Sequence, residues 1–269
     1  MKQFLIYSLL ILVLILEIFF SYHSYKDSSR FVNLQKEISQ SKGLNTTIEK
    51  KFDEMVEKIS FGVFDKYSKQ ESKTSKLSHK AKIEYKNSIN EAYYFFGTIS
   101  LFLIMFYLID IDIFIIFVSF SSIISLTFAL ISPLLTVVVY KNMPIIGDVI
   151  FSFKSKTILG TIHQMFSDNN YLVAFLVLLF SVVIPFFKSI ILLVYGFLKE
   201  YHRGKMMVDF VHKIGKWSMA DVFIVSMLLV FFSTKQDIQT LLKLQIGTYF
   251  FISYVLLSMF VSSFIAKRV

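Results

Sequence analysis

Six stretches of apolar residues alternate with polar segments along the chain. They cover residues 4–20, 93–109, 113–140, 171–198, 218–232 and 246–266. A helix needs roughly 20 apolar residues, and as few as about 17, to cross the hydrocarbon core of a bilayer. Five of the stretches reach that length, and 218–232 is shorter. The pattern therefore predicts an all-α integral membrane protein with about six transmembrane helices.

The N-terminal stretch follows Lys2 and is interrupted only by Glu17. A cleaved signal peptide would end at a site with small residues such as alanine, but the first alanine in the chain is Ala81. Residues 1–22 are therefore predicted to form an uncleaved transmembrane anchor. Residues 23–92 are rich in charge and carry apolar residues at helical spacing, which predicts a helical hairpin. That hairpin is either a solvated spacer or an element that docks a partner.

Basic residues predict the orientation of the spans. The short segment 199–217 carries five basic and two acidic residues, and short basic loops remain in the cytoplasm. Counting spans from that segment places both termini in the cytoplasm. It places residues 23–92 and 141–170 in the periplasm.

Composition and charge narrow the class of protein. Charged residues make up 17% of the chain, against about 25% in soluble domains. The net charge of +9 comes largely from segments beside apolar runs, so we expect a membrane partner and no nucleic acid. The chain has no cysteine, which excludes disulfides and thiolate metal sites. No hydrolase, metalloprotease or phosphate-loop motif is present, so we expect neither an enzyme nor a cofactor.

Ionisable side chains inside apolar spans are costly and mark functional sites by default. Glu17 lies near the predicted periplasmic end of its span, which favours snorkelling or an interfacial position over a functional role. Lys188 lies about ten residues, or roughly 15 Å, from the cytoplasmic end of its span. Ser181, Pro185 and Lys188 share one helical face, and the proline leaves the Ser181 carbonyl without its helical donor. This face is either a transport site or a packed kink with a snorkelling lysine.

Asp221 is the only carboxylate in the last three predicted spans, so it is the natural partner for Lys188. It also lies near the start of its helix, where the dipole favours a carboxylate and simple capping is the alternative. Hydroxyls extend this set, because Ser258 and Ser262 lie one turn apart in the last span. Such hydroxyls often only hold helices together. Their convergence with a lysine and an aspartate nevertheless predicts a polar interior.

Several segments resemble one known family. They are residues 157–160, 181–188, 215–223, 247–251 and 256–259. The segment GKWSMADVF resembles a G-x-W-S-M-x-D-V-F motif and contains Trp217, Ser218 and Asp221. Together these segments resemble the PqiA/LetA family (paraquat-inducible protein A) over about residues 113–269.

The resemblance implies a bacterial inner-membrane protein that moves phospholipid between the inner and outer membranes with a periplasmic MCE-domain partner. It implies a tetraspanin-like four-helix module over 113–269, with a small periplasmic β element at 141–170. The site residues that it implies are Ser181, Pro185, Lys188, Trp217, Ser218, Asp221 and Ser258.

The chain departs from the family in three respects. It has one module where many members have two, which leaves open whether two copies assemble. It lacks the cysteines of the family's zinc ribbons, and residues 1–109 have no family counterpart. Two other functions stay open: a membrane sensor or scaffold with 23–92 as its input domain, and an ion-coupled small-solute carrier that uses Lys188 and Asp221.

Overall fold

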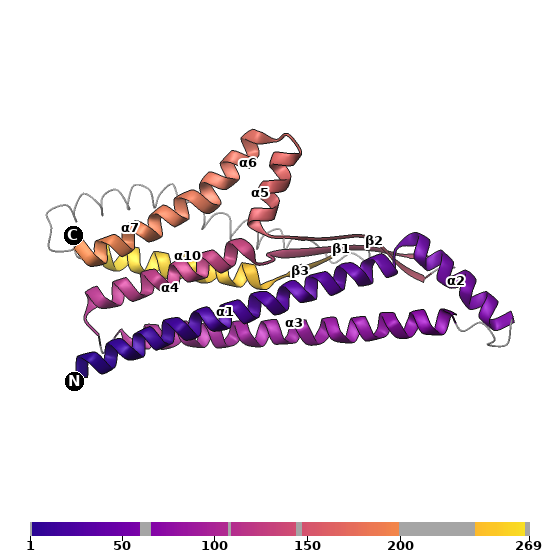
Figure 1. Ribbon diagram of the computed structural model, residues 1–269. Helices are drawn as coiled ribbons and strands as arrows, with labels where there is room; N and C mark the ends of the chain where they lie inside the picture. Colours follow the sequence, from indigo (N-terminus) through magenta and orange to yellow (C-terminus); the bar gives the residue numbers. More distant parts are fainter. Residues whose placement is uncertain (1, 60–65, 107–108, 144–146, 199–239, 267–269) are drawn as a thin grey trace.

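The computed structural model describes residues 2–59, 66–106, 109–143, 147–198 and 240–266 (Figure 1). Long helices dominate it, and four are long and apolar enough to cross a membrane. These candidate spans are Ile6–Ser41, Ile111–Ile131, Tyr171–Phe197 and Ile246–Ile265. The predicted helical membrane protein is therefore confirmed. The expected span at 93–109 is not among these four, and the expected span at 218–232 lies outside the described residues.

Two antiparallel helices of 40 residues each, α1 (Lys2–Ser41) and α3 (Lys66–Met105), run the length of the molecule (Figure 1). At 1.5 Å per residue each is about 60 Å long, twice the roughly 30 Å hydrocarbon core. Only the start of α1 and the end of α3 are apolar, so the other half of the pair extends out of the membrane. The expected second span at 93–109 therefore begins as the end of α3 and not as a separate helix.

We call the projecting part of this pair, residues 24–41 and 66–88, together with α2 (Leu44–Ile59), the stalk. Ser24 Oγ donates a hydrogen bond to the Ser88 carbonyl at 2.8 Å where the stalk begins. Further out, the Phe31 and Tyr85 rings lie 5.1 Å apart. Helix α2 lies at the outer end of the stalk (Figure 1). The expected helical hairpin is therefore present as a continuation of the apolar parts of α1 and α3.

A three-stranded antiparallel sheet lies beside the stalk (Figure 1). Its strands are β1 (Leu135–Met143), β2 (Gly147–Lys156) and β3 (Thr240–Leu244), in the order β2-β1-β3. The Ile150 N–H donates to the carbonyl of Lys42, between α1 and α2, at 2.9 Å, which joins the sheet to the outer part of the molecule. The β element expected at 141–170 thus starts earlier and gains a distant third strand, and α5 (Ile158–Ser167) replaces its second half.

Helix α4 (Ile111–Ile131) ends earlier than the predicted span over 113–140. Pro133 disfavours a helical conformation in the residue before it, and Ser132 is extended, with φ −80° and ψ 151°. The β-branched residues Val137–139 that follow suit a strand. Apolar residues after Pro133 therefore belong to β1, and hydropathy alone did not separate the two elements.

Four further helical segments complete the described part of the bundle. They are α6 (Tyr171–Leu178), a π-helical turn η1 (Leu179–Val183), α7 (Ile184–Leu198) and α10 (Ile246–Ala266). Helices α4 and α10 are antiparallel, because the Phe128 ring packs 6.0 Å from Phe250 and Phe114 packs 6.1 Å from Phe260. Phe95 of α3 lies 4.8 Å from Phe250. Helix α3 therefore shares one core with α4 and α10.

Candidate functional site

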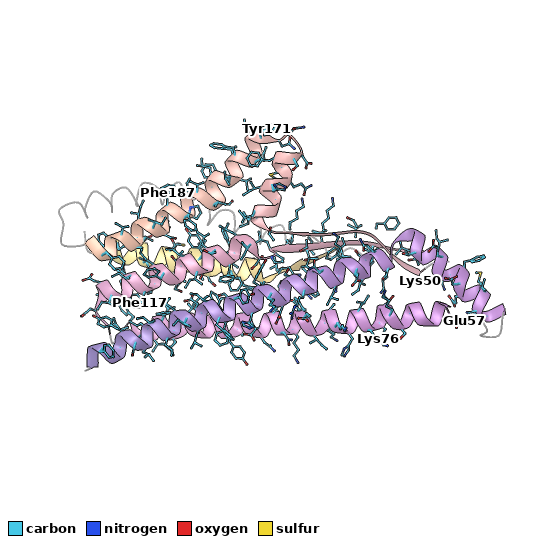
Figure 2. The ribbon with its side chains drawn as sticks, viewed as in Figure 1. Lys50, Glu57, Lys76, Phe117, Tyr171 and Phe187 are labelled. Carbon is cyan, nitrogen blue, oxygen red and sulfur yellow. The ribbon has the colours of Figure 1, made fainter. Side chains whose placement is uncertain are left out.

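Ser181, Pro185 and Lys188 lie on one buried face of the helix formed by η1 and α7, as the spacing predicts. Ser181 and Lys188 are each 7% exposed. Phe187, beside Lys188 in the sequence, is 58% exposed and lies on the outer side of α7 (Figure 2). An ammonium group is therefore held inside the bundle while its neighbour faces outward. A lysine that merely snorkelled to the surface would be exposed.

The π-helical turn directly precedes Pro185. The Ile184 N–H donates to the Leu179 carbonyl, five residues back, in place of the usual four. Such a bulge accommodates the proline, whose ring would clash with the preceding turn of a regular α-helix. The Tyr254 hydroxyl of α10 donates to the Pro185 carbonyl at 3.1 Å. The irregular turn is thus tied to the last span.

Hydroxyls gather at the level of Lys188. Helices α7 and α10 run in the same direction, so Ser258, one turn after Tyr254, lies level with the turn that follows Pro185. That turn carries Lys188 and Ser189. Both Ser189 and Ser258 are buried, and their hydroxyls have no hydrogen-bond partner among the described residues. This spacing places Lys188 and Ser258 in the same layer of the bundle.

Helix α4, which runs antiparallel to α7, contributes another serine to this layer. It packs closely on α7 at Gly196, where a Cβ would lie 2.6 Å from Ile116 Cγ1. Counting eight residues back along α7 and eight forward along α4 from that contact puts Lys188 level with Ile124, next to Ser125. Ser125 is buried, and its hydroxyl also has no partner in the described part of the chain. We call Ser125, Lys188, Ser189 and Ser258, together with Ser181 two turns earlier on the same face as Lys188, the midlayer cluster.

Trp217, Ser218 and Asp221 lie outside the described residues. Their place beside Lys188, and the pairing of Lys188 with Asp221, therefore stay predictions. Among the residues that are described, no group of three or more His, Cys, Asp or Glu could hold a metal ion. The midlayer cluster provides one cation and several hydroxyls, a set suited to binding a polar or anionic group inside an apolar bundle.

Glu17 is the residue whose position was wrongly interpreted from the sequence. It is 0% exposed and accepts a 2.6 Å hydrogen bond from the Ser121 hydroxyl of α4. Its second carboxyl oxygen is buried without a hydrogen-bond partner in the described ranges. An interfacial side chain would reach water, and this one does not. Glu17 instead joins the N-terminal helix to the bundle through a buried polar contact.

A sequence signal for this contact did exist. Glu17, Ser21, Ser24 and Ser28 follow one another at intervals of four, three and four residues, which places them on one face of a helix. All four are 0% exposed. In the apolar half of α1, where Glu17 and Ser21 lie, a polar stripe indicates a face that packs on protein and not on lipid.

The comparisons with known proteins identify the family. A family model described as PqiA, paraquat-inducible protein A, matches residues 114–269. That is more than half of the chain, so the chain belongs to the paraquat-inducible protein A family. No curated protein and no solved structure matches it. The midlayer cluster lies within the matched residues, whereas Glu17 and the stalk precede them.

Proposed function

We propose that this member of the paraquat-inducible protein A family is the inner-membrane subunit of a bacterial lipid-transport system. It would work with a periplasmic MCE-domain protein to move phospholipid between the two membranes. The observation that carries the proposal is the midlayer cluster, a buried lysine and buried serines on neighbouring helices within the family-matched spans. A phospholipid has an anionic phosphate, which a lysine and hydroxyls can bind during passage through an apolar bundle.

The stalk supports the idea of a protein partner outside the membrane. Ile48, Phe52 and Met55 lie at intervals of four and three residues on α2 and are 47%, 68% and 58% exposed. Three large apolar side chains on one helical face at the outer end of the stalk are costly in water. Such a face is typical of a protein contact. With this orientation the stalk would reach into the periplasm, where an MCE-domain protein resides.

Lys188→Ala tests the site in proteoliposomes that contain the full chain and an MCE-domain partner. We expect at least a tenfold loss in the rate at which a fluorescent phospholipid leaves the liposome, because the phosphate loses its only buried cation among the described residues. Phe187→Ala is the matched control, because Phe187 is adjacent but exposed. Circular dichroism should show unchanged helix content. Full transport by Lys188→Ala would refute the site.

A membrane sensor is the second candidate, and the continuity of α1 and α3 favours it. Each helix passes from the apolar part into the stalk without interruption. Ligand binding to the stalk could therefore shift the apolar ends of both helices. Shortening the stalk separates the two functions. A sensor would lose its response while phospholipid transport by the midlayer cluster continued.

A further inference from the structure

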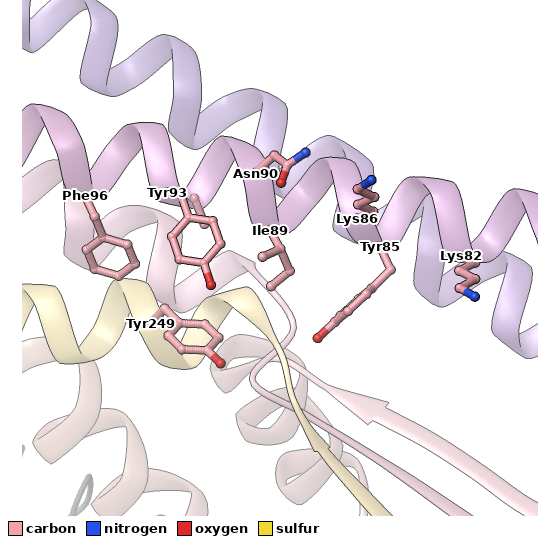
Figure 3. Close-up of a pocket in the computed structure, with 9 residues that line it drawn as sticks. Lys82, Tyr85, Lys86, Ile89, Asn90, Tyr93, Phe96 and Tyr249 are labelled. Atoms are coloured by element: carbon pink, nitrogen blue, oxygen red, sulfur yellow. The ribbon is translucent and has the colours of Figure 1, made fainter.

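A cavity of about 390 Å³ lies between α3 and the start of α10, apart from the midlayer cluster (Figure 3). Its α3 wall includes Lys82, Tyr85, Tyr93 and Phe96, and α10 contributes Tyr249. Tyr85, Ile89, Tyr93 and Phe96 follow one another at helical spacing, so one face of α3 forms the wall. Most of this wall comes from residues that precede the family-matched segment.

The two ends of the cavity differ in chemistry. Lys82 and Lys86 line the end toward the stalk, and Phe96 lines the opposite end (Figure 3). The Tyr85 and Tyr93 hydroxyls point from α3 toward α10, where Tyr249 lies. None of the described residues that line the cavity is acidic. The cavity thus has a cationic end, a middle with phenol hydroxyls and an apolar end.

Its position matches the boundary of the membrane. Tyr93 begins the apolar end of α3, and Tyr249 lies in the first turn of α10. Tyrosine prefers this boundary because its ring is apolar and its hydroxyl reaches water. Phe96 therefore lies on the membrane side of the boundary, whereas Lys82 lies on the stalk side. The polarity of the cavity follows that of the bilayer.

A lysine of strand β3 packs against the cationic end of the cavity. Lys243 Nζ lies 3.3 Å from the centroid of the Tyr85 ring, a cation–π contact. Burial is the main factor that raises the pKa of Tyr85, with Tyr249 and Tyr93 contributing. The Tyr85 hydroxyl is therefore protonated at neutral pH and can donate a hydrogen bond to an anion. The Lys243 ammonium group thus packs against the Tyr85 ring.

We propose that this cavity binds one anionic phospholipid, with its phosphate toward Lys82 and the tyrosine hydroxyls and an acyl chain along Phe96. The site would hold a lipid at the membrane boundary before or after passage through the midlayer cluster. Only this place in the transport path rests on the proposed function. Binding itself can be measured without transport.

The test is native mass spectrometry of the full chain in detergent, titrated with phosphatidylglycerol or phosphatidylcholine. We expect tighter binding of phosphatidylglycerol. Lys82→Ala/Lys86→Ala should weaken its binding on the order of tenfold, since each lysine near a charged lipid contributes a several-fold effect. Lys76→Ala/Lys80→Ala is the matched control, because both residues are exposed on α3 at the same spacing and lie outside the cavity. It should bind like the unmodified chain.

A second variant tests the middle of the cavity. Tyr93→Phe/Tyr249→Phe removes two hydroxyls and keeps both rings, so it should weaken phosphatidylglycerol binding without disturbing the fold. Unchanged phosphatidylglycerol binding in the double lysine variant would overturn the site. Equal binding of the two lipids would also overturn it, and so would displacement of phosphatidylglycerol by an equal concentration of soluble glycerol phosphate.

Failure of this inference can be distinguished from failure of the proposed function. Lys188→Ala should still bind phosphatidylglycerol at the cavity, because the midlayer cluster lies elsewhere. Lysine-dependent binding in a chain that transports no lipid would support the cavity and refute transport. If the Lys82→Ala/Lys86→Ala variant binds phosphatidylglycerol as tightly as the unmodified chain and still transports lipid, the cavity is refuted and the proposed function is not.

Discussion

Glu17 shows how much a single buried side chain contributes to joining two parts of this molecule. Its carboxyl group contacts Ser121 of α4 at 2.6 Å in a fully buried position. Glu17→Ala leaves the Ser121 hydroxyl without this acceptor, so we expect a loss of about 1–3 kcal/mol in stability. Thermal unfolding in detergent measures it. Glu37→Ala, an exposed position on the same helix, should have little effect, and equal melting temperatures for the two variants would contradict the assignment.

Gly247 occupies a position that excludes any side chain. It lies where α10 meets the end of α4, and its N–H donates to the Pro133 carbonyl at 2.8 Å. A Cβ there would lie 2.6 Å from the Pro133 oxygen and 2.7 Å from the Ser132 oxygen. Gly247→Ala should therefore destabilise the fold by about 1–3 kcal/mol, through strain in a packed junction.

A matched glycine on α3 should respond in the opposite direction. A Cβ at Gly97 would meet nothing within 4 Å, and alanine favours a helix by about 1 kcal/mol over glycine. Chemical denaturation of both variants in the same detergent compares them. Equal free energies of unfolding for Gly247→Ala and Gly97→Ala would contradict the close approach of Gly247 to the Pro133 carbonyl.

The pairing of α1 with α3 can be tested directly because the chain has no cysteine. Ser24 and Ser88 approach one another in the buried seam of the pair. We expect Ser24→Cys/Ser88→Cys to form an intramolecular disulfide on mild oxidation, measured as loss of both thiols to a mass tag. Each single-cysteine variant should keep its thiol. Two thiols that stay reactive in the double variant would contradict the register.

At the scale of elements, features set by local residue spacing could be predicted from the sequence, whereas contacts between distant segments could not. The shared face of Ser181, Pro185 and Lys188 depends only on helical spacing, and it was predicted correctly. Strand β3 pairs with β1 across roughly a hundred residues of chain, and no local signal specifies such a partner. Glu17 was misplaced because its depth was counted from the end of an apolar run, whereas α1 continues unbroken to Ser41. The prediction for Asp221 stays untested.

The whole molecule combines a family module with an N-terminal helical pair that the family match does not cover. If the stalk docks an MCE-domain partner, Phe52→Ser/Met55→Ser should abolish copurification of the two proteins and leave the fold intact, because both side chains are exposed. Ile83→Ser removes an exposed apolar side chain from α3 instead and should leave copurification unchanged. Loss of the partner in both variants would indicate a nonspecific effect and refute the α2 surface.

Helix α1 contains neither glycine nor proline from Lys2 to Ser41, and so has none of the residues at which helices usually bend sharply. It can therefore transmit a displacement along its length as a stiff rod. For a rod of about 60 Å, a tilt of about 5° displaces one end by about 5 Å relative to the other. A force applied at α2 would thus be delivered as torque to the buried contact between Glu17 and Ser121.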